Sequence, residues 1–283
     1  AGLSWTYSNS DKDYFENIFL YSPGVIIFDT LNFKESLFHK LKNISLTISL
    51  SPIFSSLSEV DHLFHRTSYI SQNWNLEKFP FIHKGLEYSV LPSGLKRVSS
   101  KNYKDNLKER KLSIGISMGG SDAPNRTLQL LKLLSNHPQE LVLWVALGEA
   151  YKHSYEDLLQ CANENKQEII LLKSNESMWR VMKNSSLVIC SGGLTTYEAT
   201  YVGLPSINIL HHSEWYYLFE ELVENKVCFT YNPAPDAIES AVDLVLDLAS
   251  DRERLMDMHL LSKGMIASGG SKRIAKEIFQ LTG

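Results

Sequence analysis

The fold is decided by residues 186–209, SLVICSGGLTTYEATYVGLPSINI. A short apolar run is followed by a serine and two glycines, then by a helical stretch, Gly-Leu-Pro and a second apolar run. Apolar runs bounded by turn residues are typical of buried strands, and paired glycines allow a tight turn into a helix. The stretch therefore predicts strand, helix and strand, the repeating unit of a parallel sheet covered by helices.

The same alternation continues through most of the chain. The second half has further apolar runs at LSIGISMGG, ELVLWVALG, EIILLK and VCFTYN, with amphipathic stretches between them. The first half is less regular: a short strand is expected in HLFHRTSYIS and a loop in EKFPFIHKGLEYSVL, and the polar, basic segment 92–111 is interpreted as a linker. The pattern predicts a two-domain α/β protein whose second domain is doubly wound.

The composition argues against several classes of function. The chain has 283 residues, 43% of them hydrophobic, and a formal net charge of -4, so neither a nucleic acid nor an anionic membrane is an expected partner. No apolar stretch approaches the roughly 20 residues that span a bilayer. The 3 cysteines are far apart and have no CxxC spacing, which argues against a disulfide framework or a zinc site and favours the cytoplasm.

Two expected strands end in glycine pairs. In SMGGSDAPNRT, Gly119 and Gly120 let the backbone approach a ligand, while Ser121, Asp122 and Asn125 offer oxygens ahead of a helix. Free N–H groups at that helix end suit a phosphate, although a capped glycine turn is an equally good interpretation of one such loop. The loop is neither a Walker loop nor a GxGxxG fingerprint, so ATP and NAD lose support.

The second glycine pair precedes a helix that contains Glu198. Thr195 and Glu198 fit a capping box, whereas a carboxylate at this place can also accept hydrogen bonds from a ribose diol. Spacing alone leaves both interpretations open. Two glycine-ended strands in one domain favour ligand binding, because they offer two helix N-termini to one nucleotide diphosphate.

Other polar residues follow expected strands. His211 and His212 come after PSINIL and are candidates for sugar contact or for solvated or capping roles, and Trp215 beside them can stack on a sugar or pack in the core. Asp29 ends VIIFD and is the candidate catalytic carboxylate of the first half, unless it caps the next helix. The histidines of residues 60–69 fit either a cleft or a solvated surface.

Three segments, GGSDAPNRT, MWRVMKNSSLVICSGGLTTYEATYVGLPSINI and MIASGGSKRIAKEI, resemble the nucleotide-binding half of two-domain GT-B proteins. The likeness is strongest to the UDP-sugar hydrolases of the pseudaminic acid pathway, and the murein N-acetylglucosaminyltransferases are a related family. The resemblance implies two Rossmann-like domains with parallel sheets, an acceptor- or catalytic-side domain over residues 1–95 and a nucleotide-sugar-binding domain over residues 96–283.

The resemblance also implies roles for individual residues. A UDP-linked amino sugar is the expected substrate, bound between the domains, and neither a metal nor a bound cofactor is implied. Glu198 would hold the ribose. The diphosphate would be held by residues of both glycine loops, namely Gly119, Gly120, Ser121, Asp122, Gly193, Thr195 and Thr196.

The first half departs from that family. Members carry an early Gly-x-Gly-His-x-x-Arg loop with the favoured base, and this chain has none before Asp29; SLSPIF stands where the hydrolases have an Asp-Asp pair. We therefore expect an incomplete N-terminal domain, completed by a missing segment or a partner, or reduced in this lineage. Hydrolysis of a UDP-sugar in cell-surface sugar biosynthesis is the leading hypothesis, and a glycosyltransferase and a catalytically silent nucleotide-sugar-binding protein are the alternatives.

Overall fold

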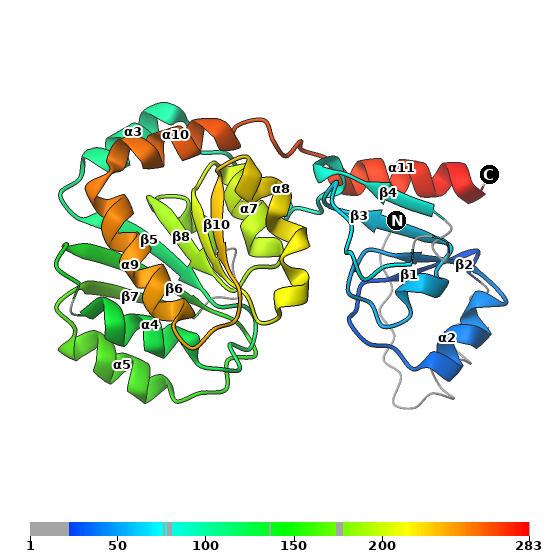
Figure 1. Ribbon diagram of the computed structural model, residues 1–283, viewed down its shortest axis with the longest axis horizontal. Coiled ribbons are helices and arrows are strands. Elements are labelled where there is room, and N and C mark those ends of the chain that lie inside the picture. The colour runs from blue at the N-terminus through cyan, green and yellow to red at the C-terminus, as the bar shows by residue number, and fades with distance from the viewer. Residues whose placement is uncertain (1–22, 76, 78–80, 136, 174–177, 283) are drawn as a thin grey trace. The chain divides into compact units, whose positions relative to one another are not determined.

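The chain forms two compact units, each built on its own parallel β-sheet (Figure 1). The computed structural model describes residues 23–75, 77, 81–135, 137–173 and 178–282. The first unit takes in the described residues up to Val90 together with those from Gly269 onwards, and the second runs from Leu91 to Ser268. The last helix therefore groups with the first unit, although the sequence placed it in the C-terminal domain.

The first unit is a four-stranded sheet whose strands follow chain order and are all parallel. Its strands are β1 (Val25–Phe28), β2 (Leu46–Ser49), β3 (His62–His65) and β4 (Phe81–Lys84). Its helical elements are α2 (Glu35–Lys42), α11 (Gly270–Thr282) and the 3-10 turns η1 (Leu57–Glu59) and η3 (Leu86–Tyr88).

Helices cover both faces of this sheet. Successive residues of a strand point to opposite faces, and Leu63 packs with Phe38 of α2 while Phe64 packs with Ile274 of α11. Polar contacts also hold α11 against the sheet. Tyr88 Oη donates to Glu277 Oε1 at 2.8 Å, and His83 Nδ1 lies 2.8 Å from Glu277 Oε2. The last helix is thus tied to the first unit by an apolar contact and by one carboxylate.

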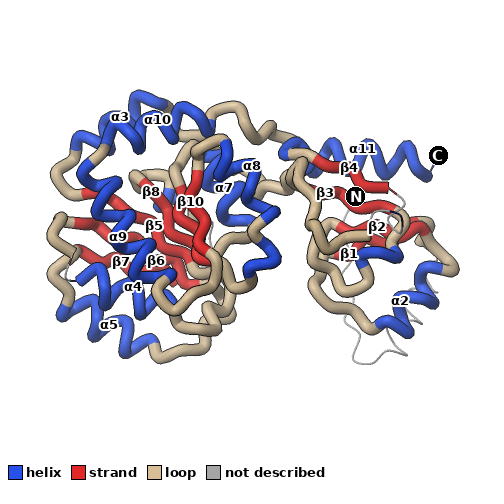
Figure 2. Tube along the Cα trace, in the orientation of Figure 1, coloured by secondary structure: helices blue, strands red, loops and turns tan. Residues whose placement is uncertain are grey.

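The second unit is a six-stranded parallel sheet in the order β10-β9-β8-β5-β6-β7, enclosed by helices (Figure 2). The strands are β5 (Leu112–Ser117), β6 (Leu141–Leu147), β7 (Glu168–Lys173), β8 (Leu187–Cys190), β9 (Ser206–Ile209) and β10 (Cys228–Tyr231). The helices are α3 (Ser100–Lys108), α4 (Arg126–Ser135), α5 (Tyr155–Glu164), α6 (Trp179–Met182), α7 (Leu194–Val202), α8 (Tyr217–Glu224), α9 (Ala237–Ser250) and α10 (Arg252–Ser262), with the 3-10 turn η4 (Ser213–Trp215).

The strand order reverses between β5 and β8. From β5 the chain proceeds through β6 to β7, and from β8 it proceeds in the opposite direction through β9 to β10. Right-handed crossovers then place α4 and α5 on one face and α7 and α8 on the other. Figure 1 shows α9 beside α4. In open parallel sheets, ligands bind outside the carboxyl ends of the strands at such a reversal.

The predicted α/β class with parallel sheets is confirmed, and residues 186–209 form β8, α7 and β9. Two local predictions are wrong. The loop expected in EKFPFIHKGLEYSVL contains β4, an edge strand. The linker expected over residues 92–111 contains α3, which Ser99 caps by accepting from the amide of Asn102 and whose Tyr103 is fully buried. None of the helices that the structure describes is long and apolar enough to pass through a bilayer.

Candidate functional site

The two glycine loops leave neighbouring strands at the strand-order reversal. Ser117 at the end of β5 pairs with Cys190 at the end of β8, so both loops begin at the same level of the sheet. Gly119 has φ +84°, and a Cβ at this position would lie 3.2 Å from Ser191 Oγ of the second loop. The structure therefore brings the two predicted loops together, and a side chain at position 119 would strain the backbone and crowd the Ser191 hydroxyl.

Gly120 and Ser121 are the exposed part of the first loop. A Cβ on Gly120 would meet no atom within 4 Å, and its φ is not in the left-handed region. The backbone of Gly120 packs against Gly148 instead, where a Cβ would come within 2.2 Å of Gly120 O. The exposed side of Gly120 is thus open backbone that a ligand can approach.

Asp122 caps α4. Its carboxylate accepts from the amide of Arg126 on Oδ1 and from the amide of Thr127 on Oδ2, each at 2.9 Å, and the residue is 3% exposed. Two of the N–H groups at the start of α4, those of Arg126 and Thr127, are therefore already bonded. The place of Asp122 along the diphosphate stays a prediction, and the structure shows that its carboxylate is engaged by two amides of α4.

The start of α7, by contrast, has no side-chain cap. Its N-cap residue is Gly193, with φ +83° and open space around the Cβ position. The first amides of a helix have no partner within the helix, so those of Leu194, Thr195 and Thr196 are available to an anion. The hydroxyl of Thr196 is not, because it is fully buried and donates to Asn208 Oδ1 at 2.8 Å.

Glu198 lies one turn further along α7 and is partly buried. The capping-box interpretation is wrong: Thr195 is inside the helix, and Gly193 occupies the N-cap position without a side-chain bond. The indole Nε1–H of Trp179 donates to Glu198 Oε2 at 2.7 Å. Burial raises the pKa of Glu198, and the bond from Trp179 partly offsets that shift.

Two histidines follow β9 at the same edge of the sheet. His211 is partly buried, and its pKa is lowered by burial and by the charges of Arg126 and His212. The imidazole of His211 is therefore neutral at neutral pH and can accept a hydrogen bond. His212 is exposed, with its ring centroid 4.4 Å from that of Trp215, which is partly buried.

Arg126 was missed by the sequence analysis. Its guanidinium donates to Ile209 O at 2.7 Å and to Leu210 O at 3.1 Å, so it connects the start of α4 to the end of β9. This places His211 beside the first glycine loop, and Asp122 contributes to the electrostatic environment of His211. The carbonyl partners of Arg126 lie 83 and 84 positions away in the sequence, so no local motif indicates these contacts.

In the first unit, Asp29 is exposed and directly follows β1. It does not cap α2, whose N-cap residue is Lys34. The solvated-surface interpretation of the β3 histidines is wrong: His62 is 8% exposed and His65 is fully buried, and burial lowers the pKa of His65 to about 4.

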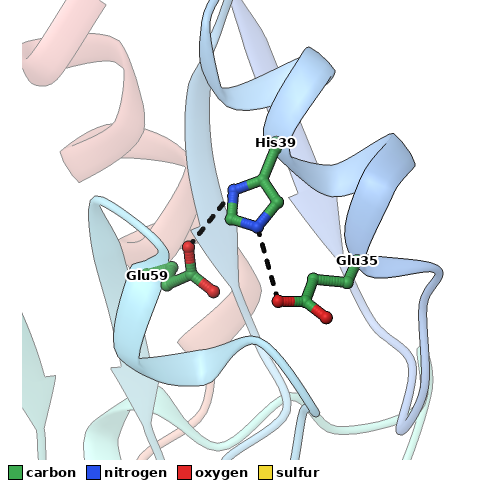
Figure 3. Close-up of side chains that lie close together, drawn as sticks. All are labelled: Glu35, His39 and Glu59. Atoms are coloured by element: carbon green, nitrogen blue, oxygen red, sulfur yellow. Dashed lines mark ion pairs between the residues drawn. The ribbon is translucent and has the colours of Figure 1, made fainter.

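Among the described residues, one cluster has the side chains of a metal site. Figure 3 shows His39 of α2 between Glu35 of the same helix and Glu59 of η1, with Nε2 3.6 Å from Glu35 and Nδ1 3.4 Å from Glu59. The two carboxylates lie nearest to different ring nitrogens, and Glu35 and His39 are exposed. Exposed acidic groups of this kind are common without a metal ion, so the cluster by itself is not evidence of a metal site.

Comparisons with known proteins show which family this chain is similar to. Residues 96–277 match the model of the glycosyltransferase family 28 C-terminal domain. The chain is 25% identical over 219 residues to the uncharacterized protein MJ1062 of Methanocaldococcus jannaschii, covering 73% of this chain and 44% of that protein. It is 23% identical over 191 residues to the UDP-N-acetylglucosamine–N-acetylmuramyl-(pentapeptide) pyrophosphoryl-undecaprenol N-acetylglucosamine transferase of Francisella philomiragia, covering 64% and 50%.

The chain thus spans about half the length of the curated relatives it matches. Among solved structures, Acinetobacter baumannii MurG aligns with a TM-score of 0.61 at 14% identity, over 86% of this chain and 75% of that one. A putative UDP-N-acetylglucosamine 2-epimerase from Listeria monocytogenes aligns with a TM-score of 0.62 at 13% identity, over 98% and 81%. These likenesses confirm the predicted GT-B-like fold.

Proposed function

Because the chain belongs to the family of the glycosyltransferase family 28 C-terminal domain, we propose that its second unit binds the nucleotide of a UDP-sugar donor for glycosyl transfer. The observation that carries the proposal is the meeting of two glycine loops at the strand-order reversal, where Gly119 adjoins Ser191. Such a place in a doubly wound sheet is where nucleotides bind.

The diphosphate is assigned to the exposed parts of the two loops. Gly120 and Ser121 offer open backbone and a hydroxyl, and the uncapped start of α7 offers the amides that follow Gly193. Amide groups at a helix N-terminus favour a negative charge through both hydrogen bonds and the helix dipole. The side chains of Asp122 and Thr196 are left out of this assignment, because other contacts already occupy them.

The ribose is assigned to Glu198 and the sugar to the loop after β9. Glu198 is partly exposed, and a carboxylate there can accept hydrogen bonds from a diol. His211 and His212 follow β9 at the same edge of the sheet and supply candidate contacts to the sugar. Asp29 stays the candidate catalytic carboxylate of the first unit, which we propose to be the acceptor side.

We propose glycosyl transfer rather than hydrolysis. Hydrolysis is the leading hypothesis from the sequence alone. The matching family is a glycosyltransferase family, and the Francisella relative is named as a transferase that uses UDP-N-acetylglucosamine. Both reactions break the same sugar–phosphate bond and leave the charge on UDP, so one nucleotide site serves either of them. They differ in whether a hydroxyl of an acceptor or water attacks the sugar.

Binding of UDP to the full chain, measured by isothermal titration calorimetry, tests the nucleotide assignment. Gly120→Ala puts a methyl group into open space without backbone strain, so the protein should fold normally and lose about tenfold in UDP affinity, as expected when one charge-assisted hydrogen bond is lost. Gly24→Ala is the matched control, because Gly24 also has open space around its Cβ position and an unstrained φ. Equal UDP affinity in all three proteins would contradict the assignment.

Product analysis with UDP-N-acetylglucosamine then separates the reactions. Release of UDP only when an acceptor is present supports transfer, whereas free sugar and UDP formed without an acceptor would restore the hydrolase hypothesis. Tight binding of UDP without turnover under either condition would favour the silent nucleotide-sugar-binding protein.

A further inference from the structure

Glu198 is held by a residue that the nucleotide assignment does not include. Trp179 begins α6, ahead of β8, and Glu198 belongs to α7, which follows β8. The indole of Trp179 is 4% exposed, and its Nε1–H reaches Glu198 Oε2 at 2.7 Å. A short bond from a buried, rigid ring to a carboxylate fixes the position of that oxygen and the plane of the carboxylate.

The other oxygen of Glu198 is differently placed. Within the described part of the chain, Oε2 accepts the indole bond and Oε1 has no hydrogen-bond donor. Because Glu198 is only partly buried, the carboxylate presents one oriented and unshared oxygen together with the remaining lone pair of Oε2. The Glu198 carboxylate can therefore accept hydrogen bonds from the hydroxyl groups of a ligand.

We propose that Trp179 is a positioning residue that orients Glu198 toward a vicinal diol and so makes the site select ribonucleotides over 2′-deoxyribonucleotides. This inference rests on the proposed nucleotide site and adds a determinant of specificity to it. A freely rotating carboxylate would lose rotational freedom when it met two hydroxyl groups, whereas one already fixed by an indole avoids that loss.

The same contact also affects the pKa of Glu198. Burial raises the pKa of its carboxyl group, and the indole bond lowers it. Among the described residues, the thiol of Cys190 on β8 interacts electrostatically with Glu198, and this thiol is neutral because burial raises its pKa to about 11. Without the indole N–H, Glu198 should therefore be protonated at a higher pH and lose its ability to accept two hydrogen bonds.

The test compares UDP with 2′-deoxy-UDP on the wild-type 283-residue chain and on Trp179→Phe, from pH 5 to 8. Both nucleotides carry the same phosphates, so the ratio of their dissociation constants at each pH isolates the ribose contact from phosphate titration. A hydrogen bond to a charged group predicts a preference for UDP of about tenfold or more in the wild type. In Trp179→Phe the preference should fall at least about threefold, and its loss on acidification should begin at a higher pH.

Trp144→Phe is the matched control. The indole of Trp144 also donates to a side-chain oxygen of the same unit, Ser113 Oγ, at 3.0 Å, but on β6. Its loss should leave both the ribose preference and its pH profile unchanged. Failure of wild type to bind UDP would overturn the proposed function and this inference together. Normal UDP binding, with a preference and pH profile that Trp179→Phe does not alter, would overturn the inference alone.

A wild-type measurement covers the case in which Trp179→Phe does not fold. The assigned indole ¹H–¹⁵N resonance of Trp179 should titrate with Glu198, and UDP should move the midpoint to lower pH, because diol hydrogen bonds favour the ionised carboxylate. An indole resonance that does not titrate, or a midpoint that saturating UDP leaves in place, would contradict the proposal.

Discussion

Removing the carboxylate of Asp122 should destabilise the second unit without weakening UDP binding. Two amides at the start of α4 lose their acceptor in Asp122→Ala, which costs about 2 kcal/mol for a buried helix cap. Asp122 also has φ +42°, in the left-handed region that asparagine and aspartate tolerate, so alanine adds about 1 kcal/mol of backbone strain. The free energy of unfolding should therefore fall by about 3 kcal/mol in total.

Asp122→Asn isolates one part of this loss. Asparagine tolerates the backbone conformation and keeps one acceptor, so the expected loss is about 1 kcal/mol. For a unit of this size, 1 kcal/mol corresponds to about 2–4 °C, so the melting temperature should fall by about 6–12 °C in Asp122→Ala and by about 2–4 °C in Asp122→Asn. Urea denaturation followed by tryptophan fluorescence gives the free energies.

Ser121→Ala is the neighbouring control. Ser121 is exposed, so its loss should leave stability unchanged but weaken UDP binding if the hydroxyl contacts the diphosphate. The Asp122 variants should show the reverse, with lower stability and unchanged UDP affinity well below their melting temperatures. An Asp122→Asn protein with wild-type stability and at least about tenfold weaker UDP binding would refute the capping argument.

Two further predictions concern the first unit. Burial lowers the pKa of His65 from 6.5 to about 4, so this residue is neutral in the folded protein. Its contribution to stability is full above pH 6.5 and is lost on acidification, by about 3 kcal/mol near pH 4, because the unfolded chain is protonated first. The pH-dependent loss of stability between pH 7 and 4 should be smaller by this amount in His65→Gln, and an unchanged pH profile would contradict the argument. Glu277→Ala removes the acceptor of Tyr88 and the partner of His83, so hydrogen exchange should show faster opening of α11 with a loss of about 1–2 kcal/mol. Unaltered protection would show that the Glu277 carboxylate does not help to hold the helix.

The strands around the candidate site could be predicted because they are buried on both faces. Strands of that kind are short apolar runs, and glycines mark the turns after them, as in residues 112–120 and 186–193. The two elements that were missed lack this signal. The edge strand β4 has two exposed residues of its four, Phe81 and Lys84, and so has no continuous apolar run.

The missed helix α3 carried a weaker signal. Its buried residues, Tyr103 and Leu107, are four positions apart in an otherwise polar stretch, which is the spacing of one helix face. The high content of lysine concealed that spacing. Tyr103 Oη also donates to Ser186 O at 2.6 Å, a long-range contact that only the folded chain shows.

The side-chain contacts of the site could not be read from the sequence. Ser121, Asp122 and Asn125 could each cap a helix, and only the folded loop shows that the Asp122 carboxylate accepts from the amides of α4. Trp179 lies 19 positions before Glu198, and its indole reaches that carboxylate only because α6 and α7 flank β8. Spacing rules describe single elements, whereas these contacts join two of them.

The most direct test of the account is a crystal structure of the full chain with UDP. We expect density for the diphosphate against the backbone of Gly120 and the first amides of α7, with a ribose hydroxyl within hydrogen-bonding distance of Glu198. Saturating UDP that leaves both glycine loops empty, or a nucleotide bound elsewhere on the second unit, would contradict the central claim.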